Sequence, residues 1–341
     1  MSPLLRIDDL SVAFPTDDGL VEAVRNVSFD VESGEIVALV GESGSGKSVT
    51  ALSVMRLHPA NTRITGRILF EGRDLLGLDR KTMRSVRGRD IAMIFQDPMT
   101  ALNPVFTVGD QIVEMIRLHT DTSKQDAWKR AADLLELVGV PEPGRRVRQY
   151  PHEFSGGMRQ RAMIAMAIAN QPKLLIADEP TTALDVTIQA QVLEVMKAAQ
   201  EATGAAILMI THDLGIVAGL VDRVQVMYGG RIFERGTVDD IFYRSANPYT
   251  RGLMASVPRV DSRRGERLVP IPGAPPNALA MPSGCAFSPR CAHADERCRA
   301  EGAQLTPVAP GHDSRCHKLV EIGALTAAEI ARGDAVGEVT A

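Results

Sequence analysis

The sequence predicts an α/β fold with a mixed β-sheet core and a helical segment inserted between two strands. Two observations lead to this prediction. First, the continuous apolar run Ile36–Val40 leads into the glycine-rich stretch Gly41–Ser48 and then into a helix-forming segment, the pattern of a strand buried on both faces of a sheet. Second, the apolar runs Leu174–Ala177 and Ile207–Ile210 both end on polar residues, as strands do where a ligand sits at their carboxyl ends.

The N-terminal elements follow from the same patterns. Residues 4–14 and 21–40 are expected to be rich in strand, and Ser48–Leu57 to form a helix. Ile91–Phe95 is a further apolar run and predicts a second buried strand. Asp97–Pro104 contains two prolines and is expected to be a loop.

The second half of the chain divides into distinct stretches. Val105–Ala169 has a helical pattern and predicts a helical insert at about residues 105–169. Val224–Tyr228, followed by two glycines, predicts a hairpin. Pro270–Pro289 carries six prolines, which exclude a helix or a central strand. We therefore expect a main domain over residues 1–260 and, over residues 261–341, a proline-rich linker with a small cysteine-bearing extension.

Composition and charge narrow the class of protein. The chain has 341 residues, 45% of them hydrophobic and 23% charged, which is enough apolar mass for a large core. The formal net charge is −4 and the basic residues are scattered, so we expect no nucleic-acid partner. No apolar run approaches the roughly 18 residues of a membrane helix, and the N-terminus lacks a signal-peptide pattern. We therefore expect a cytoplasmic chain, with any membrane parts supplied by other proteins.

A glycine-rich loop of the form G-x-x-x-x-G-K-[ST] follows the first buried strand. Its members are Gly41, Glu42, Ser43, Gly44, Ser45, Gly46, Lys47 and Ser48. Glycines let backbone N–H groups close around phosphate oxygens, and the following helix offers the positive end of its dipole. Lys47 is expected to reach the β- and γ-phosphates of ATP, and Ser48 to bind Mg²⁺. A chance glycine turn is the alternative, which the flanking strand and helix argue against.

Acidic, amide and imidazole side chains follow the other predicted strands. Asp178 is expected to hold Mg²⁺ through water, and Glu179 beside it is the expected general base for the attacking water. Gln96 is expected to sense the Mg²⁺ and the attacking water, and His212 to contact the γ-phosphate as a switch. Each has a structural alternative, because Asp-Glu-Pro can open a turn, and glutamine and histidine are ordinary polar turn residues.

A second glycine-rich anion site is predicted far downstream of the first. Ser155 can cap a helix that begins near Met158, and Gly156 and Gly157 keep the N-terminus of that helix free of side chains. A simple capped helix is the alternative interpretation. Because the chain already has one complete phosphate site, a second site on the helical insert makes most sense if it faces the ATP held by another chain.

All four cysteines lie near the C-terminus: Cys285, Cys291, Cys298 and Cys316. In a reducing cytoplasm such a cluster indicates a metal or iron–sulfur site before it indicates disulfides. The spacings match neither common zinc sites nor ferredoxins, so spacing alone names no metal. Four thiolates suit a 4Fe–4S cluster or Zn²⁺, and four free buried thiols are the remaining alternative. We expect a structural staple rather than a redox centre.

In their order along the chain, these motifs resemble the ATP-binding cassette (ABC) family. The matching features are the phosphate loop, Gln96, the Ser155-Gly156-Gly157 signature, Asp178-Glu179, Ala183-Leu184-Asp185 and His212. The resemblance spans roughly residues 4–260 and implies a P-loop NTPase of ABC type, with a helical subdomain that carries the signature. It implies a head-to-tail dimer that holds ATP between the phosphate loop of one subunit and the signature of the other. Phe14 would then stack on adenine, and Asp185 would belong to the nucleotide site.

Four segments are similar to the oligopeptide, dipeptide and nickel importer branch of that family: Phe95–Pro104, Phe154–Arg161, Asn247–Thr250 and Gly284–Cys291. Met158 stands where the general family signature has glutamine. The closest similarity is to the D-type ATPase subunit, some members of which carry a 4Fe–4S cluster. This resemblance implies ATP-driven import of peptides at the cytoplasmic face of the membrane. The implied partners are an F-type ATPase subunit, two membrane permease subunits and an extracytoplasmic solute-binding protein.

The cargo stays open at this point, because close relatives handle nickel chelates or glutathione. A different class, the ABC ATPases of DNA repair, also carries cysteine-held metal. Those chains have two cassettes or long coiled coils, which this sequence lacks.

Overall fold

The structure, a computed structural model, describes residues 2–182, 184–256 and 270–319. Its contacts divide the chain into two compact units. The first consists of Met1–Leu5, Asp30–Ile36 and Leu69–Ile210, and the second of Arg6–Phe29, Val37–Ile68 and Thr211–Ala341, within the described ranges. The two units are described in turn.

Three parallel strands form the sheet of the first unit: β6 (Ile91–Ile94), β7 (Leu174–Asp178) and β8 (Ala206–Thr211), in the order β8-β7-β6. Every residue of these strands is buried, which explains why they are continuous apolar runs in the sequence. Asp178 pairs with Ile210, so both strands bring their carboxyl ends to the same edge. The predicted strands are confirmed.

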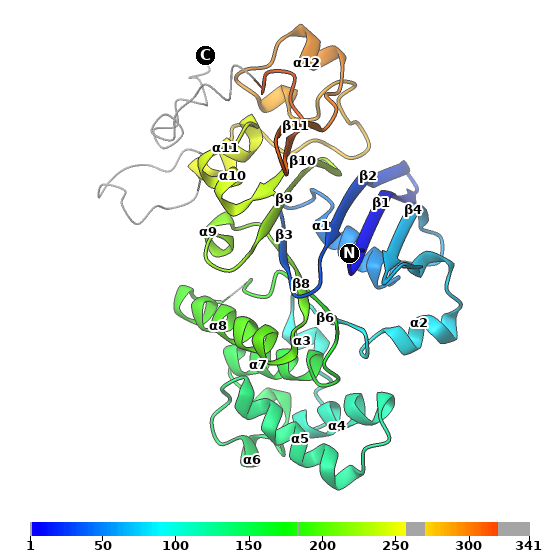
Figure 1. Cartoon of the computed structure of the whole chain (residues 1–341), viewed down its shortest axis with the longest axis vertical. Coiled ribbons are helices and arrows are strands. Elements are labelled where there is room, and N and C mark those ends of the chain that lie inside the picture. The colour runs from blue at the N-terminus through cyan, green and yellow to red at the C-terminus, as the bar shows by residue number, and fades with distance from the viewer. Residues whose placement is uncertain (1, 183, 257–269, 320–341) are drawn as a thin grey trace. The chain divides into compact units, whose positions relative to one another are not determined.

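Helices make up most of the remaining first unit, and several begin at a side-chain cap. They are α2 (Arg80–Val86), α3 (Pro98–Ala101), α4 (Val108–His119), α5 (Lys124–Leu137), α6 (Pro143–Arg146), α7 (Gly156–Ala167) and α8 (Val186–Thr203). Thr107, Ser123 and Ser155 each accept a hydrogen bond from the backbone N–H three residues later. Helices α4, α5 and α7 pack on one another (Figure 1). No helix in the described residues is long and apolar enough to cross a membrane.

The segment Asp97–Pro104 is not wholly a loop, so that prediction is wrong in part. Helix α3 forms because the Asp97 side chain accepts a hydrogen bond from the N–H of Met99 (2.8 Å). Pro98 fits the first helical position, where an N–H has no intrahelical partner to lose. The segment therefore contains a single helical turn, which Pro98 begins and which ends before Pro104.

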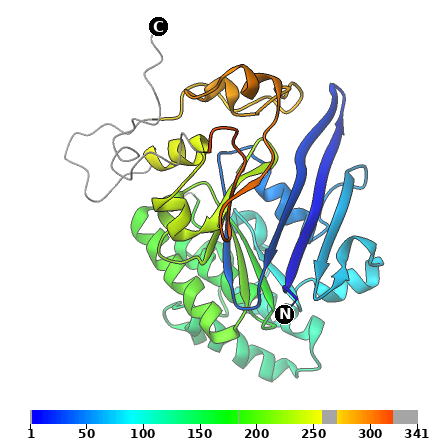
Figure 2. The same cartoon turned by 45° about the horizontal axis from the view of Figure 1, so that its top comes forward.

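Two sheets contribute to the second unit. In one, β1 (Leu5–Thr16), β2 (Gly19–Val31) and β4 (Arg63–Phe70) lie in the order β2-β1-β4. The last two residues of β4 pair with β5 (Arg73–Asp74), and both belong to the first unit. Figure 2 shows the long strands β1 and β2 side by side, in dark blue. The strand-rich N-terminus expected from the sequence is thereby confirmed.

The other sheet of this unit contains β3 (Ile36–Val40), β9 (Arg223–Tyr228) and β10 (Arg231–Thr237). β3 is parallel to β9, and β9 forms the predicted antiparallel hairpin with β10. The helices of the unit are α1 (Lys47–Val54), α9 (Leu214–Val217), α10 (Val238–Tyr243), α11 (Pro248–Ala255) and α12 (Glu296–Ala300), with a 3-10 turn at Ser288–Arg290.

The C-terminal segment adds strands to that sheet. β11 (Thr306–Ala309) and β12 (His312–Ser314) form a hairpin, and β12 pairs antiparallel with β10. Residues 270–287 contain no helix or strand. The prediction for Pro270–Pro289 is wrong at its end, where Ser288–Arg290 form a 3-10 turn with Pro289 in its first positions. The predicted boundary between residues 260 and 261 falls in residues 257–269, outside the described residues.

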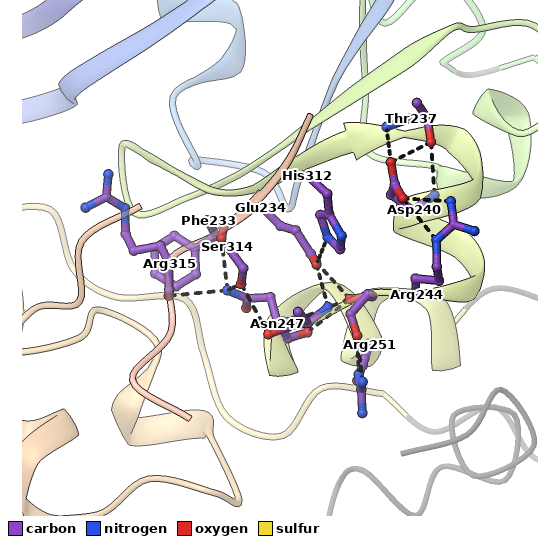
Figure 3. Close-up of polar contacts among 12 residues, drawn as sticks. Phe233, Glu234, Thr237, Asp240, Arg244, Asn247, Arg251, His312, Ser314 and Arg315 are labelled. Carbon is purple, nitrogen blue, oxygen red and sulfur yellow. Dashed lines mark hydrogen bonds and ion pairs between the residues drawn. The ribbon is translucent and has the colours of Figure 1, made fainter. Parts of the chain in front are cut away.

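A buried polar network holds β12 against β10 (Figure 3). Glu234 on β10 is fully buried, and its carboxylate lies 2.9 Å from Nε2 of His312 and accepts hydrogen bonds from Ser245 and from the N–H of Ala246. Asn247 donates from its side-chain amide to the carbonyl of Phe233 on β10 and to that of Arg315, directly after β12. The C-terminal segment is therefore a packed part of the second unit, because its buried polar groups find their partners there.

Candidate functional site: a phosphate loop, an acidic strand end and a bare helix start

The phosphate loop connects β3 to α1 in the second unit. Gly44 and Gly46 have φ angles of 77° and 105°, in the left-handed region that favours glycine. A Cβ on Gly46 would collide with the carbonyl oxygen of Ala23, and one on Gly41 with that of Met227. The path of the backbone therefore requires these glycines, and α1 begins directly after the last of them.

The polar groups of the loop fit a polyphosphate. Lys47 is only 4% exposed, and its ammonium donates to the carbonyl oxygens of Gly41 (2.7 Å) and Glu42 (2.9 Å). The buried hydroxyl of Ser45 has no hydrogen-bond partner within the described part of the chain. Ser48 follows in the first turn of α1. A buried cation and an unpartnered hydroxyl at the N-terminal end of a helix suit phosphate oxygens, so these residues fit ATP.

Glu179 and Gln96 come together in the first unit. Nε2 of Gln96 donates to Oε2 of Glu179 at 2.9 Å, and the hydroxyl of Thr182 donates to the same oxygen at 2.8 Å. Two donors fix the orientation of the carboxylate. Thr182 belongs to no motif singled out in the sequence, and its only signal is its position three residues after Glu179.

The backbone at Glu179 is strained. Its φ of 46° lies in the left-handed region, which costs a residue other than glycine about 1 kcal/mol or more. Its N–H donates to the carbonyl of Ile210 at 2.9 Å, so the neighbouring strand holds this conformation. Asp178, directly before it, ends β7 and is 7% exposed. Strain of this kind is typical of residues whose side chain must point in a particular direction.

The start of α7 carries no side chain that would cover it. The hydroxyl of Ser155 accepts a hydrogen bond from the N–H of Met158 (3.3 Å), and Ser155 and Gly156 are both exposed. A Cβ on Gly156 would meet nothing within 4 Å, whereas one on Gly157 would lie 3.0 Å from the side chain of Ile188. This helix end is therefore accessible to an anion presented from outside the chain.

The remaining predicted residues lie on separate elements. Asp185 caps α8 by accepting from the N–H of Ile188 (3.0 Å), while Ala183 of the same motif lies outside the described residues. His212 follows β8 and is exposed. Phe14 on β1 is half-buried and contacts the ring of His58 edge-on, with 5.5 Å between the ring centroids. The second unit contains the phosphate loop, Phe14 and His212; the first contains Gln96, Ser155, Gly156, Gly157, Asp178, Glu179 and Asp185.

Two residues from the segments similar to the importer branch contact the phosphate loop, although nothing in the sequence indicates these contacts. Tyr249 accepts a hydrogen bond from the backbone N–H of Glu42, and Arg290 donates to the Glu42 carboxylate. They are 207 and 248 positions from Glu42 along the chain, so no local pattern links them to the loop.

The four cysteines line one cavity of the second unit. Burial raises the pKa of Cys291 to about 12 and that of Cys316 to about 11, so both thiols are protonated near neutral pH. In the described residues, no group of three or more His, Cys, Asp or Glu side chains is arranged to hold a metal ion. The predicted iron–sulfur or zinc centre therefore receives no support from the side-chain geometry.

Comparison with known proteins agrees with the site. The family model described as "ABC transporter" matches residues 24–182, and the model described as "Oligopeptide/dipeptide transporter, C-terminal region" matches residues 233–298. Among solved structures, the dimeric ATP-binding cassette MJ0796 bound to ADP and Pi superposes with a TM-score of 0.62 at 25% identity, over 69% of this chain and 98% of that one. The fold and the site thus define an ATP-binding cassette.

Relatives place the chain more closely. It is 57% identical to the oligopeptide transport ATP-binding protein OppD of Bacillus subtilis, over 85% of this chain and 82% of that protein. It is 50% identical to OppD of Salmonella typhimurium, over 93% of this chain and 94% of that protein. OppD of Mycobacterium tuberculosis is 52% identical over 97% of this chain, which spans about half (54%) of that longer relative. The chain belongs to the ABC transporter family, in the group of oligopeptide and dipeptide transport ATP-binding proteins.

Proposed function

We propose that this protein is the ATP-hydrolysing subunit of a transporter that imports di- and oligopeptides across the cytoplasmic membrane. The observation that carries the proposal is the hydrogen bond from Gln96 to Glu179 at the end of a buried strand, in a chain that also has a complete phosphate loop. The peptide cargo is inferred from the relatives, which are named as oligopeptide and dipeptide transport proteins.

The proposed roles follow from the chemistry of the side chains. When bound, ATP would supply the γ-phosphoryl group, which is transferred to water as its bond to the β-phosphate breaks, and Mg²⁺ would neutralise the developing charge. Lys47 and the loop N–H groups would hold the phosphates, and Ser48 and Asp178 would hold the metal. His212 contacts the γ-phosphate, and Phe14 stacks on adenine.

Glu179 is the proposed general base. An ionised carboxylate can accept the proton of the attacking water, provided that it points at that water. The hydrogen bonds from Gln96 and Thr182 hold the carboxylate in one orientation. Gln96 would thereby position the base as well as sense the metal and the attacking water.

The exposed start of α7 is proposed to complete a site on another ATPase subunit. Ser155, Gly156 and Gly157 would contact the phosphates held by the partner, and Asp185 would lie at the same interface. The sequence supports a D-type subunit, so an F-type subunit is the proposed partner. The pair of ATPase subunits is proposed to lie at the cytoplasmic face of the membrane beneath two permease subunits. An extracytoplasmic solute-binding protein is proposed to deliver the peptide to the permeases.

An exposed apolar surface near Gln96 is the proposed contact with the permease. Phe95, Met99, Val105 and Phe106 are 40%, 60%, 71% and 52% exposed. Exposed apolar side chains gathered along one short segment of the chain are typical of a protein–protein contact. Leu102, in the same segment, is only 3% exposed and therefore does not belong to this surface.

Reconstitution tests the proposed function. The chain, its partner ATPase and the permeases are placed in proteoliposomes with the binding protein, and uptake of a labelled di- or oligopeptide is measured with and without ATP. ATP-dependent peptide uptake is the expected result. Uptake of a nickel chelate or glutathione in preference to peptides would contradict the proposed peptide cargo. Absence of ATP hydrolysis would contradict the proposed ATPase activity.

We also propose that Cys285, Cys291, Cys298 and Cys316, which line one cavity, bind an inorganic centre. The resemblance to D-type subunits, some of which carry such a cluster, favours a 4Fe–4S cluster over Zn²⁺. Binding would have to displace thiol protons and rearrange the side chains. Anaerobic purification, metal analysis and visible absorption test this. Stoichiometric iron together with visible absorption would support the cluster. Zinc without iron would show that the site holds Zn²⁺ instead, and the absence of any metal would show that the cysteines form no metal site.

A further inference from the structure

Glu42, the second residue of the phosphate loop, has every polar group engaged within the second unit. Its N–H donates to the hydroxyl of Tyr249 (2.9 Å), and its carbonyl oxygen accepts from the ammonium of Lys47 (2.9 Å). Its carboxylate accepts two hydrogen bonds from Arg290, at 2.6 and 3.0 Å. Glu42 therefore contacts both Arg290 and the lysine expected to bind phosphate.

Arg290 is held in place on all sides. It lies on the 3-10 turn that precedes Cys291 and is 8% exposed. Nε donates to the carbonyl of Pro272 (2.8 Å), and Nη1 also donates to the hydroxyl of Tyr228 (3.2 Å). Its guanidinium carbon lies 5.9 Å from the ring centroids of both Tyr228 and Phe287. Such a planar, fixed fork pairs with a carboxylate in one geometry only.

Charge gives this contact a consequence for ATP. The Glu42 carboxylate lies in the loop that would receive the negatively charged phosphates. Left unpaired, it would repel them, and this repulsion would be strong because the pair is partly shielded from water. Arg290 cancels that charge, and through Glu42 it also fixes the carbonyl group that holds Lys47.

We propose that Arg290 is a positioning residue of the phosphate loop, so that the affinity for ATP depends on the C-terminal segment. It acts through Glu42 in two ways, by neutralising the carboxylate and by fixing the loop backbone together with Tyr249. The inference rests on the proposed ATP site. It assigns to residues of the C-terminal region a role in nucleotide binding.

A charge-rescue experiment on the full chain tests this proposal. The dissociation constant of a non-hydrolysable ATP analogue is measured for the wild type, Arg290→Met, Glu42→Gln and the double variant. Arg290→Met is expected to raise it by about tenfold or more, because one uncompensated charge remains in the loop. Glu42→Gln removes that charge, so the double variant is expected to regain most of the affinity. A purely structural role of Arg290 predicts no such rescue.

Arg315→Met is the matched control. Arg315 is also partly buried in the C-terminal segment and donates to the carbonyls of Ile232 and Ala303, which lie outside the phosphate loop. Its replacement is expected to lower the melting temperature without weakening nucleotide binding. Should Arg290→Met be insoluble, Tyr249→Phe carries the test, because it removes only the hydroxyl that accepts the Glu42 N–H and is expected to weaken binding several-fold.

The outcomes separate this proposal from the proposed function. If the wild type itself does not bind the analogue, the ATP site is wrong. If the wild type binds and Arg290→Met and Tyr249→Phe bind equally well, the positioning role is overturned. The positioning role is also overturned if Arg290→Met binds the analogue weakly and the double variant, which adds Glu42→Gln, binds it no more tightly.

Discussion

Glu179 combines a left-handed backbone with a carboxylate held by two donors. The backbone conformation aims the side chain, and the donors fix its rotation. Replacing the carboxylate by the amide of the same shape therefore tests the chemistry with little disturbance of the fold.

Glu179→Gln is expected to reduce ATP hydrolysis in the assembled transporter by about 10²–10⁴-fold, because the water loses its proton acceptor. Binding of ATP should persist. Phosphate release and nucleotide binding are measured side by side, with Glu201→Gln, an exposed change on α8, as the control. If Glu179→Gln hydrolysed ATP at nearly the rate of the wild type, Glu179 would not be the general base.

His58, which contacts Phe14 of the proposed adenine site, makes the stability of the fold depend on pH. Its Nε2 lies 2.9 Å from the Ser53 hydroxyl and 3.0 Å from the Val49 carbonyl, and burial lowers its pKa below the ordinary 6.5. The unfolded chain then binds a proton at a higher pH than the folded chain does. The stability contributed by neutral His58 is thus present above the ordinary pKa and is lost as the pH falls through it towards the folded-state value.

We therefore expect the melting temperature of the wild type to fall, relative to that of His58→Gln, as the pH is lowered from about 8 to about 5.5. Glutamine keeps a donor for the Val49 carbonyl and has no proton to gain. Thermal melts of both proteins across this range measure the difference. Parallel curves for the two proteins would show that His58 does not couple stability to pH.

The residues of the candidate site differ in how far the sequence could predict them. The phosphate loop could be predicted because its glycines, lysine and serine are adjacent, and Asp178 because it ends an apolar run. Gln96 and Glu179 could be predicted one by one, but their hydrogen bond depends on strand order, which the sequence leaves open. The contact between Arg290 and Glu42 could not be predicted, because residues 248 positions apart leave no local pattern in the sequence.

Among the elements, α7 shows how a helix can be stable and still present an open end. Capping also explains why the prediction of a loop over Asp97–Pro104 was wrong in part. The Asp97 side chain caps a turn of helix and Pro98 occupies its first position, where a proline is compatible with a helix. Buried strands were predicted well, since residues hidden on both faces must be apolar along their whole length.

Gly156→Asp separates the stability of α7 from its proposed function. A carboxylate in the first turn of a helix interacts favourably with the dipole, and the open space around Gly156 admits the side chain, so the fold is expected to be unchanged. The added negative charge would repel the phosphates of a partner's ATP, so hydrolysis by the two-subunit assembly is expected to fall by about tenfold or more.

The melting temperature of the isolated chain and the ATPase rate of the assembly are the two measurements. Gly156→Ala serves as the control, because it fills the same space without charge. Full activity of Gly156→Asp in the assembly would show that the start of α7 faces no nucleotide.

At the scale of the whole molecule, the chain depends on partners for the proposed transport, and the exposed apolar surface near Gln96 is where we expect the permease. A photo-crosslinking amino acid at Met99 or Val105 should capture a permease subunit in membranes, because both side chains are well exposed. Leu118 on α4, which is 65% exposed and lies outside this surface, is the matched control position. Crosslinks from Leu118 and none from Met99 or Val105 would place the contact elsewhere.

The distance of 248 positions between Glu42 and Arg290 also sets a schedule for synthesis. At about 5–20 residues per second, the phosphate loop leaves the ribosome on the order of ten to fifty seconds before the arginine that neutralises it. Throughout that interval the nascent chain carries an unbalanced carboxylate in its nucleotide loop. High affinity for ATP is therefore expected only after Arg290 has been made, when nearly all of the residues described here are in the chain. Unfinished chains are expected to bind the nucleotide weakly.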